Sequence, residues 1–187
     1  CWKFTTVSPN YLKELSINSN GLEKLFQSEE SKGIGIINGI DTQVWDPESD
    51  PMIFQNYGIE TSDNGKKENK KNLCKEFGLS ATRPLVVFIG RLVGEKGAEM
   101  LPLAIDSCLK KYKGKVNFIV LGSGEPEIED ELEALKIKHS KQCGIYIGYD
   151  EELSHRIYAG ADFLMMPSRV EPCGLNQLYA VRYGTMP

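Results

Sequence analysis

The segment "PLVVFIGRLVGEKG" (84–97) joins an uninterrupted apolar run to a basic loop bracketed by glycines. Further apolar runs follow at "VNFIVLG" (116–122), "GIYIG" (144–148) and "DFLMMP" (162–167). Runs without polar alternation are typical of parallel strands that are covered on both faces. The sequence therefore predicts four parallel strands in one sheet.

Longer amphipathic segments separate these runs, at about 97–111, 127–139 and 151–159, and another begins near Gly174. Repeated strand–helix–strand units form right-handed crossovers and place helices on both faces of a sheet. We therefore expect an α/β fold with a doubly wound, Rossmann-like parallel sheet.

The first part of the chain is less regular. "WKFTTVSPNYLKEL" (2–15) predicts a short strand, a turn and a helix, whereas the polar residues 18–32 predict a surface loop. "GIGIINGIDTQVWDPESDP" (33–51) predicts a short strand followed by a turn-rich connection. Residues 61–79 predict a loop and then a helix that ends near Gly78, with its lysines on a solvated face.

Composition limits the classes of function. With 187 residues, 41% of them hydrophobic and 26% charged, the chain is long and apolar enough for a soluble domain with a sizeable core. A net charge of −4 disfavours general binding to nucleic acid or membranes, so any anion requires a local cluster of positive groups. Five scattered cysteines without zinc-ligand spacing favour a reducing compartment and no metal site.

Ligands of doubly wound sheets bind at the carboxyl ends of the strands. The loop after the first run holds Arg91 and Lys96 at a predicted helix start, where free N–H groups and two cations would suit a phosphate. The same residues can also form an ordinary basic turn.

The next two loops carry glycines and a tyrosine. Gly122-Ser123-Gly124 lets a ligand approach the backbone, but Glu127 stands where a dinucleotide fingerprint requires its third glycine. Tyr149 follows the third run, where it can stack on a base or only pack at the rim.

The fourth loop, "PSRVEPCGL" (167–175), leads into a helix whose first N–H groups, at 174–176, would face the same edge. Ser168 and Glu171 are its polar candidates; Glu171 can accept bonds from sugar hydroxyls or only cap the helix. Cys173 has no histidine base nearby in sequence, which favours a role in shaping the turn over a reactive thiol. His139 and His155, on predicted surface helices, are expected to be structural.

Taken together, Arg91, Lys96, the Gly122–Gly124 turn, Tyr149 and "PSRVEPCGL" resemble the carboxyl-terminal half of the glycogen and starch synthases. The resemblance extends to "TTVSPNYLKEL", "GIINGIDTQVWDP", "GYDEELSHRIYAGADFLMMPSR" and "QLYAVRYGTMP", and thus to nearly the whole chain. It implies a retaining glucosyltransferase of the two-domain GT-B architecture. Such an enzyme moves glucose from ADP-glucose, or less often UDP-glucose, to the non-reducing end of an α-1,4-glucan, and no metal or other cofactor is expected.

The resemblance also implies residue roles. Arg91 and Lys96 match the pair that holds the donor diphosphate, Glu171 the carboxylate at the donor glucose, and Tyr149 the residue that stacks on the base. The remaining matches are Gly122, Ser123, Gly124, Ser168, Cys173, Gly174 and Leu175 on the donor side and Asn38 on the acceptor side. Asn176 stands where some members carry a hydroxyl residue that touches phosphate.

By the same resemblance, residues 1–32 would be the tail end of an amino-terminal GT-B domain. Residues 33–187 would be the carboxyl-terminal nucleotide-sugar domain, incomplete at its end. Because GT-B enzymes close two domains over the donor, we expect the 187 residues alone to be catalytically silent. The parent would be cytoplasmic in a bacterium or plastidial in a plant or alga.

Two alternatives stay open at this stage. A dinucleotide-dependent oxidoreductase would share the parallel sheet, although the G-x-G-x-x-G motif is missing. A non-catalytic nucleotide-binding relative would share the fold without the chemistry.

Overall fold

The computed structural model describes residues 2–187. Its contacts divide the chain into unit 1, which runs to Ile40 and also includes Val170–Leu175, and unit 2, which comprises Asp41–Arg169 and Asn176–Pro187. The sequence predicted a division after residue 32. The observed division falls later because the strand Gly33–Gly35 pairs with Phe4–Thr6.

Unit 1 is built on a two-stranded parallel sheet, in which Thr5 lies opposite Ile34. The side chain of Ser8 accepts a hydrogen bond from the N–H of Tyr11 and caps the first helix, as Ser-Pro before an amphipathic run predicts. The elements are β1 (Phe4–Thr6), α1 (Pro9–Leu15), α2 (Glu23–Ser28), a 3₁₀ turn (Glu30–Lys32) and β2 (Gly33–Gly35).

The prediction of a loop over 18–32 was wrong, because α2 lies within it. The carboxylate of Glu23 accepts bonds from the N–H groups of Ser19 and Gly21, which organises the start of this helix. Phe26 then packs against Phe4, with ring centroids 5.6 Å apart. The helix in this polar segment is thus supported by the carboxylate of Glu23 at its start and by the packing of Phe26 on Phe4.

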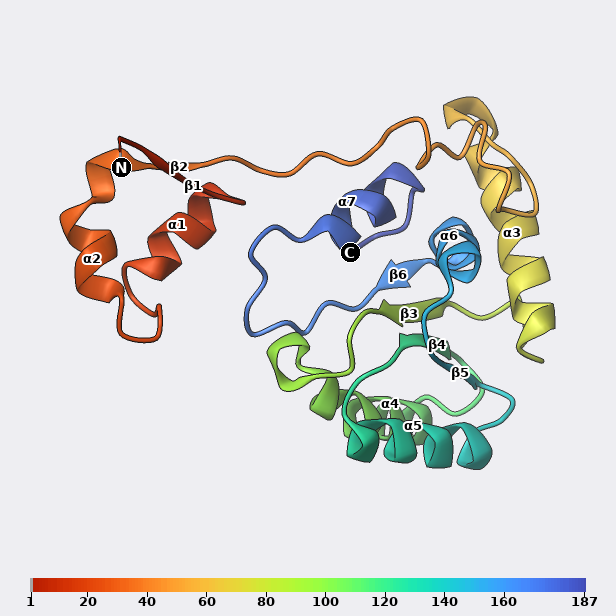
Figure 1. Ribbon diagram of the computed structural model, residues 1–187. Coiled ribbons are helices and arrows are strands. Elements are labelled where there is room, and N and C mark those ends of the chain that lie inside the picture. Colours follow the sequence, from red (N-terminus) through yellow and green to blue (C-terminus); the bar gives the residue numbers. More distant parts are fainter. Residues whose placement is uncertain (1) are drawn as a thin grey trace. The chain divides into compact units, whose positions relative to one another are not determined.

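Unit 2 contains the predicted parallel sheet, with the strand order β5-β4-β3-β6 (Figure 1). The strands are β3 (Leu85–Ile89), β4 (Asn117–Gly122), β5 (Cys143–Ile147) and β6 (Phe163–Leu164), and every pairing is parallel. β6 is shorter than the predicted run, which ends in Pro167, a residue without an N–H to donate to a sheet.

The helices of unit 2 follow the predicted segments closely. They are α3 (Ser62–Glu76), α4 (Leu101–Lys111), α5 (Pro126–Lys138), α6 (Glu151–Gly160) and α7 (Leu175–Arg182), with 3₁₀ turns at Ile59–Thr61, Gly94–Lys96 and Ala98–Met100. As predicted, α3 ends just before Gly78, whose φ of 65° lies in the left-handed region that glycine tolerates.

Two separate cores cover the two faces of this sheet. Leu85 and Val87 of β3 belong to a core with residues of α3, α6 and α7, whereas Phe88 belongs to a core with residues of α4 and α5. We call these sides the α3/α6 face and the α4/α5 face. The doubly wound, Rossmann-like arrangement is therefore confirmed.

Two sequence predictions for the α3/α6 face were wrong. His155 of α6 is fully buried rather than on a surface helix, because residues from the 41–57 segment cover it. The lysines of α3 are not all solvated either: Lys66 donates to the carbonyls of Ala159 and Tyr183, and Lys70 pairs with Asp162 at 2.6 Å.

Over residues 2–187, the structure contains no helix that combines the length and the apolar character needed to cross a membrane.

Candidate functional site

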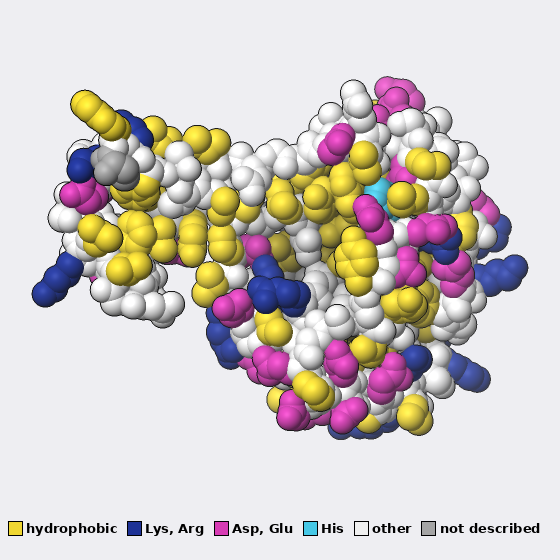
Figure 2. Space-filling model, in the orientation of Figure 1, with side chains coloured by type: hydrophobic (Ala, Val, Ile, Leu, Met, Phe, Trp, Pro, Cys, Tyr) yellow, Lys and Arg dark blue, Asp and Glu magenta, His cyan; other side chains and the backbone are white. Residues whose placement is uncertain are grey.

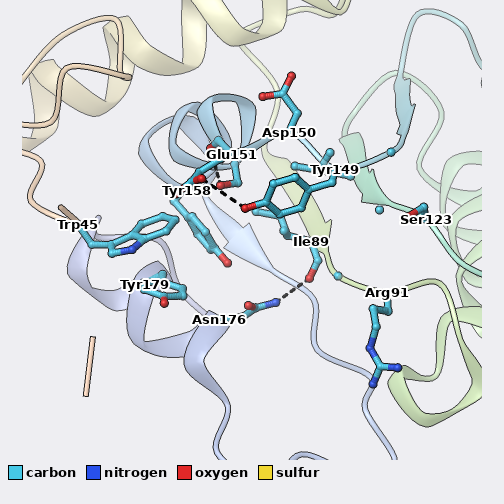
Figure 3. Close-up of a pocket in the computed structure, with 15 residues that line it drawn as sticks. Trp45, Ile89, Arg91, Ser123, Tyr149, Asp150, Glu151, Tyr158, Asn176 and Tyr179 are labelled. Atoms are coloured by element: carbon cyan, nitrogen blue, oxygen red, sulfur yellow. Dashed lines mark hydrogen bonds between the residues drawn. The ribbon is translucent and has the colours of Figure 1, made fainter. Parts of the chain in front are cut away.

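Unit 2 contains a cavity of about 360 Å³ where the loops after β3, β4 and β5 meet α6 and α7 (Figure 3). Its position at the carboxyl ends of parallel strands agrees with the prediction from the doubly wound sheet. The lining consists of Trp45, Ile89, Gly90, Arg91, Leu121, Gly122, Ser123, Gly148, Tyr149, Asp150, Glu151, Ser154, Tyr158, Asn176 and Tyr179.

Arg91 supplies the positive charge of this lining. It follows β3 directly, and its guanidinium lies 3.2 Å from the carboxylate of Glu95 in a well-exposed pair. An exposed ion pair of this kind contributes little stability, so a bound anion can compete with Glu95 for the guanidinium.

Lys96 lies in the 3₁₀ turn that follows Arg91, outside the lining of the cavity. The next residue, Gly97, has a φ of 64°, and a Cβ there would stand 2.3 Å from the carbonyl oxygen of Pro167. The loop therefore requires glycine both for its backbone angle and for its packing against the chain that leaves β6.

The turn after β4 packs directly against the loop after β3. A Cβ on Gly122 would lie 1.9 Å from the Gly90 carbonyl oxygen, and one on Gly124 would lie 2.2 Å from that of Leu92. The missing side chains of both glycines thus let the two loops pack closely. Gly122 and Ser123 line the cavity and Gly124 does not, and the approach of a ligand to this backbone stays a prediction.

Tyr149 stands at the opening of the cavity after β5. Its side chain is 85% exposed, and its hydroxyl donates to the carboxylate of Glu151 at 3.4 Å. Asp150 caps α6 by accepting a hydrogen bond from the N–H of Leu153 at 2.9 Å. The arrangement leaves the tyrosine ring available for stacking on a planar group.

Asn176 connects α7 to the sheet. Its side-chain amide donates to the carbonyl oxygen of Ile89 at 2.6 Å, at the point where β3 ends. The residue predicted to contact a donor phosphate thus lies in the cavity lining and also fixes the start of α7.

The predicted site residues are divided between the two units. Ser168 belongs to unit 2, outside the lining of the cavity, as does Gly124. The other candidates, Asn38, Glu171, Cys173, Gly174 and Leu175, belong to unit 1. There the sulfur of Cys173 lies 4.0 Å from the carbonyl oxygen of Asn38, so the structure brings these two residues together.

Sequence reasoning missed the aromatic wall of the cavity, which consists of Trp45, Tyr158 and Tyr179. The ring of Tyr179 stacks on Trp45 at 4.0 Å, and Tyr158 meets Trp45 edge-on at 5.8 Å. Burial raises the pKa of both phenols, so they remain neutral. A tryptophan within the turn-rich segment "TQVWDP" was the available signal, since such loops are otherwise polar.

Among residues 2–187, no group of three or more His, Cys, Asp and Glu side chains has the arrangement of a metal site. The cavity offers one guanidinium, two carboxylates, aromatic rings, and backbone groups at the ends of parallel strands. The non-aromatic polar side chains besides Arg91 are those of Ser123, Asp150, Glu151, Ser154 and Asn176. Such a set can bind an anionic ligand with a planar ring.

The fold and this cavity define an α/β protein of the doubly wound type with a ligand-sized cavity at the carboxyl ends of its strands. Residues 69–187 match the family described as "Glycosyl transferases group 1", and the chain belongs to that family.

Two curated relatives are named glycogen synthase. The protein from Flavobacterium johnsoniae is 51% identical over 98% of this chain and 39% of its own length, and that from Thermodesulfovibrio yellowstonii is 41% identical over 98% and 37%. This chain therefore spans less than two-fifths of the relatives that it matches.

Solved structures agree with this family. The catalytic domain of starch synthase IV from Arabidopsis thaliana, bound to ADP and acarbose, superposes with a TM-score of 0.90 at 40% identity, over 100% of this chain and 38% of that one. Anabaena HepE in complex with UDP, at 16% identity and a TM-score of 0.65, shares the fold. The oxidoreductase alternative is not supported, because the family and these relatives are glycosyltransferases.

Proposed function

We propose that this chain is the nucleotide-sugar-binding part of a glycogen or starch synthase. The reaction is transfer of glucose from ADP-glucose, or UDP-glucose, to the non-reducing end of an α-1,4-glucan with retention of configuration. The observation that carries the proposal is the 0.90 TM-score to a starch synthase domain that was solved with ADP and acarbose. Those two ligands are a nucleoside diphosphate and an oligosaccharide mimic, as donor and acceptor require.

The cavity supports a donor role in chemical terms. Arg91 matches a cation that stabilises negative charge on the departing diphosphate, and electrostatic stabilisation of developing charge is usually the largest single contribution to catalysis. Lys96 is proposed to act with it, and Tyr149 to stack on the base. Glu171 is proposed to bind the donor glucose.

The remaining donor contacts are proposed for Ser123, Ser168 and Asn176 side chains and for the backbone near Gly122, Gly124 and Cys173–Leu175. Asn38 is proposed to face the acceptor. The reaction as proposed uses no metal and no further cofactor, and its partners are the donor and the glucan.

The proposal includes an amino-terminal domain, because the chain spans only 39% of the Flavobacterium johnsoniae relative. Unit 1 exposes apolar side chains that such a domain would cover (Figure 2). The most exposed are Trp2, Ile17, Leu25, Ile36 and Ile37. We propose that the 187 residues alone bind donor without elongating glucan, and that the complete enzyme acts in the cytoplasm or a plastid.

Glucan elongation by the complete polypeptide that carries these residues tests the proposal, with ADP-glucose and UDP-glucose as donors. Arg91→Ala should lower kcat by more than about 100-fold, because losing one such charge contact costs about 3 kcal/mol. Arg83→Ala is the matched control, since Arg83 precedes β3 at the opposite end of the strand and donates to the Lys141 carbonyl. A rate within about tenfold of the unmodified enzyme would refute the role of Arg91.

A titration of the 187-residue chain with ADP-glucose and with NADH tests ligand class independently of catalysis. Saturable binding of ADP-glucose alone is the expected result. A complete polypeptide that binds ADP-glucose but never elongates glucan would instead be a non-catalytic relative.

A further inference from the structure

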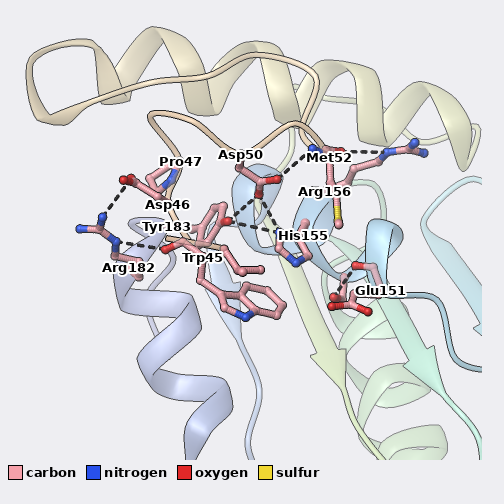
Figure 4. Close-up of polar contacts among 12 residues, drawn as sticks. Trp45, Asp46, Pro47, Asp50, Met52, Glu151, His155, Arg156, Arg182 and Tyr183 are labelled. Atoms are coloured by element: carbon pink, nitrogen blue, oxygen red, sulfur yellow. Dashed lines mark hydrogen bonds and ion pairs between the residues drawn. The ribbon is translucent and has the colours of Figure 1, made fainter. Parts of the chain in front are cut away.

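A buried polar cluster lies directly behind the aromatic wall of the cavity (Figure 4). Its members are Asp50, His155 and Tyr183, whose side chains are at most 1% exposed. Asp50 Oδ2 lies 2.7 Å from His155 Nδ1 and accepts a hydrogen bond from the Tyr183 hydroxyl at 2.5 Å. The other oxygen of Asp50 accepts from the N–H of Met52 at 2.8 Å. None of these three residues is needed by the proposed chemistry.

The imidazole of this cluster contacts the cavity wall through Trp45. The rings of His155 and Trp45 are stacked, with centroids 3.7 Å apart and an interplanar angle of 16°. Trp45 lines the cavity and His155 does not. The ring of His155 therefore contacts the wall of the cavity through the indole.

The hydrogen bonds of the cluster define the state of the imidazole. Nδ1 faces the carboxylate of Asp50, whereas Nε2 is buried and has no hydrogen-bond partner within residues 2–187. A proton on Nε2 would bury a donor without an acceptor, which is costly, so the proton belongs on Nδ1. The plane of the ring is thus set by its bond to Asp50.

The backbone of Trp45 is fixed from a second direction. Arg182 of α7 donates to the Trp45 carbonyl oxygen at 3.2 Å and pairs with Asp46 at 2.9 Å. These contacts hold the backbone of the loop, whereas the indole ring is held by the rings stacked on it, those of His155 and Tyr179. The orientation of the ring depends on what stacks against it.

We propose that His155 is a positioning residue that holds Trp45 in the wall of the ligand cavity. Asp50 and Tyr183 orient the imidazole, the imidazole orients the indole, and the indole shapes the surface that a bound nucleotide meets. The proposal rests on the proposed function only for the choice of ADP as the probe.

The test uses the 187-residue chain in a Trp2→Phe background, which leaves Trp45 as its single tryptophan. Trp2 is 94% exposed and belongs to unit 1, so this change does not touch the cluster. His155→Asn keeps a donor for Asp50 and removes the stacked ring. His139→Asn is the matched control, because His139 is bound to Asp106 and lies outside the cavity lining.

His155→Asn should weaken ADP binding about tenfold, and His139→Asn should leave the dissociation constant unchanged. The His155→Asn substitution should also remove the near-ultraviolet circular dichroism band of Trp45, measured without ligand. A folded His155→Asn chain that keeps this band and binds ADP within about threefold of the parent would overturn the proposal.

Two further measurements test the positioning role of His155 even if the chain does not bind ADP or the variant does not fold. If the unmodified chain binds no ADP, the proposed function is in error, while the ligand-free dichroism of His155→Asn still decides the positioning role. Nuclear magnetic resonance of the imidazole nitrogens in the unmodified chain requires no variant to fold. It should show a proton on Nδ1, and a ring that carries its proton on Nε2 instead would contradict the arrangement.

Discussion

Leu132 on the α4/α5 face and His155 on the α3/α6 face are both fully buried, but their neighbours differ in kind. Leu132 packs in a core of aliphatic and aromatic side chains. His155 lies among Asp50, Tyr183 and Trp45, next to the wall of the cavity. One face of the sheet provides apolar burial, and the other combines burial with a hydrogen-bonded cluster that supports the site.

The largest effect is expected for Asp50→Ala on the α3/α6 face. It leaves the N–H of Met52, His155 Nδ1 and the Tyr183 hydroxyl without their acceptor. We expect a loss of about 4 kcal/mol in the free energy of unfolding, measured in urea, because each buried unpaired donor costs 1 kcal/mol or more. Tyr183→Phe, which removes one donor only, should cost about 1 kcal/mol.

The apolar face should respond differently. Leu132→Ala removes a fully buried side chain from α5, and the cavity left behind should cost about 3 kcal/mol of unfolding free energy. Its dissociation constant for ADP should stay unchanged, whereas folded variants of the Asp50 cluster should bind ADP more weakly. Equal weakening by Leu132→Ala would remove the distinction between the faces.

The sequence predicted the α4/α5 face better than its counterpart. The amphipathic α5 segment on this face depends on local periodicity, which is visible without contacts. Asp50 and His155 are 105 positions apart, so no local pattern reveals that they pair.

The sequence predicted part of the candidate site and missed the rest. Arg91, Ser123, Tyr149 and Asn176 meet at one cavity because strand ends converge, which sheet topology alone implies. Gly122 and Gly124 were predicted to let a ligand approach the backbone, which stays a prediction, and only coordinates show that they also let a neighbouring loop approach. Trp45 lies in an irregular connecting segment, and no periodic pattern in the sequence predicts that this segment reaches the cavity.

Lys66, on the α3/α6 face, contributes a pH dependence to the stability of the chain. Burial lowers the pKa of this lysine to about 8, while an unfolded chain keeps the proton to about 10.5. Between these values the unfolded state binds more protons than the native state, so the free energy of unfolding rises with pH. The contribution of Lys66 to the change from pH 8 to 10 should be a rise of about 2 kcal/mol. Burial also raises the pKa of the Cys74 thiol to about 11 and that of the Cys143 thiol to about 12, and these groups lower the free energy of unfolding over the same range. The contribution of Lys66 is therefore the difference between the parent chain and a Lys66 variant.

Relative to the parent chain, Lys66→Met should lower the change in unfolding free energy between pH 8 and 10 by about 2 kcal/mol, and Lys67→Met, at the exposed neighbouring position, should leave that change as in the parent. Urea titrations at several pH values measure the slope. An identical slope in the Lys66→Met chain would show that the lysine is protonated in the native state throughout this range.

Tyr149→Ala should produce the smallest change and only in binding. The ring is 85% exposed, so stability should stay within about 0.5 kcal/mol of the parent. Loss of a stacking partner should weaken ADP about tenfold by calorimetry. Tyr112→Ala, at the end of α4, is the control and should bind normally.

The central claim is that a nucleotide-sugar donor binds where the strands end against the α3/α6 face. Backbone amide shifts of the isotope-labelled chain, recorded during titration with ADP, test it most directly. We predict saturable shifts at Trp45, Gly90–Arg91, Ser123 and Gly148–Glu151, with Ile128–Leu135 unmoved. Shifts centred on α4 and α5, or none at saturating ADP, would contradict the account.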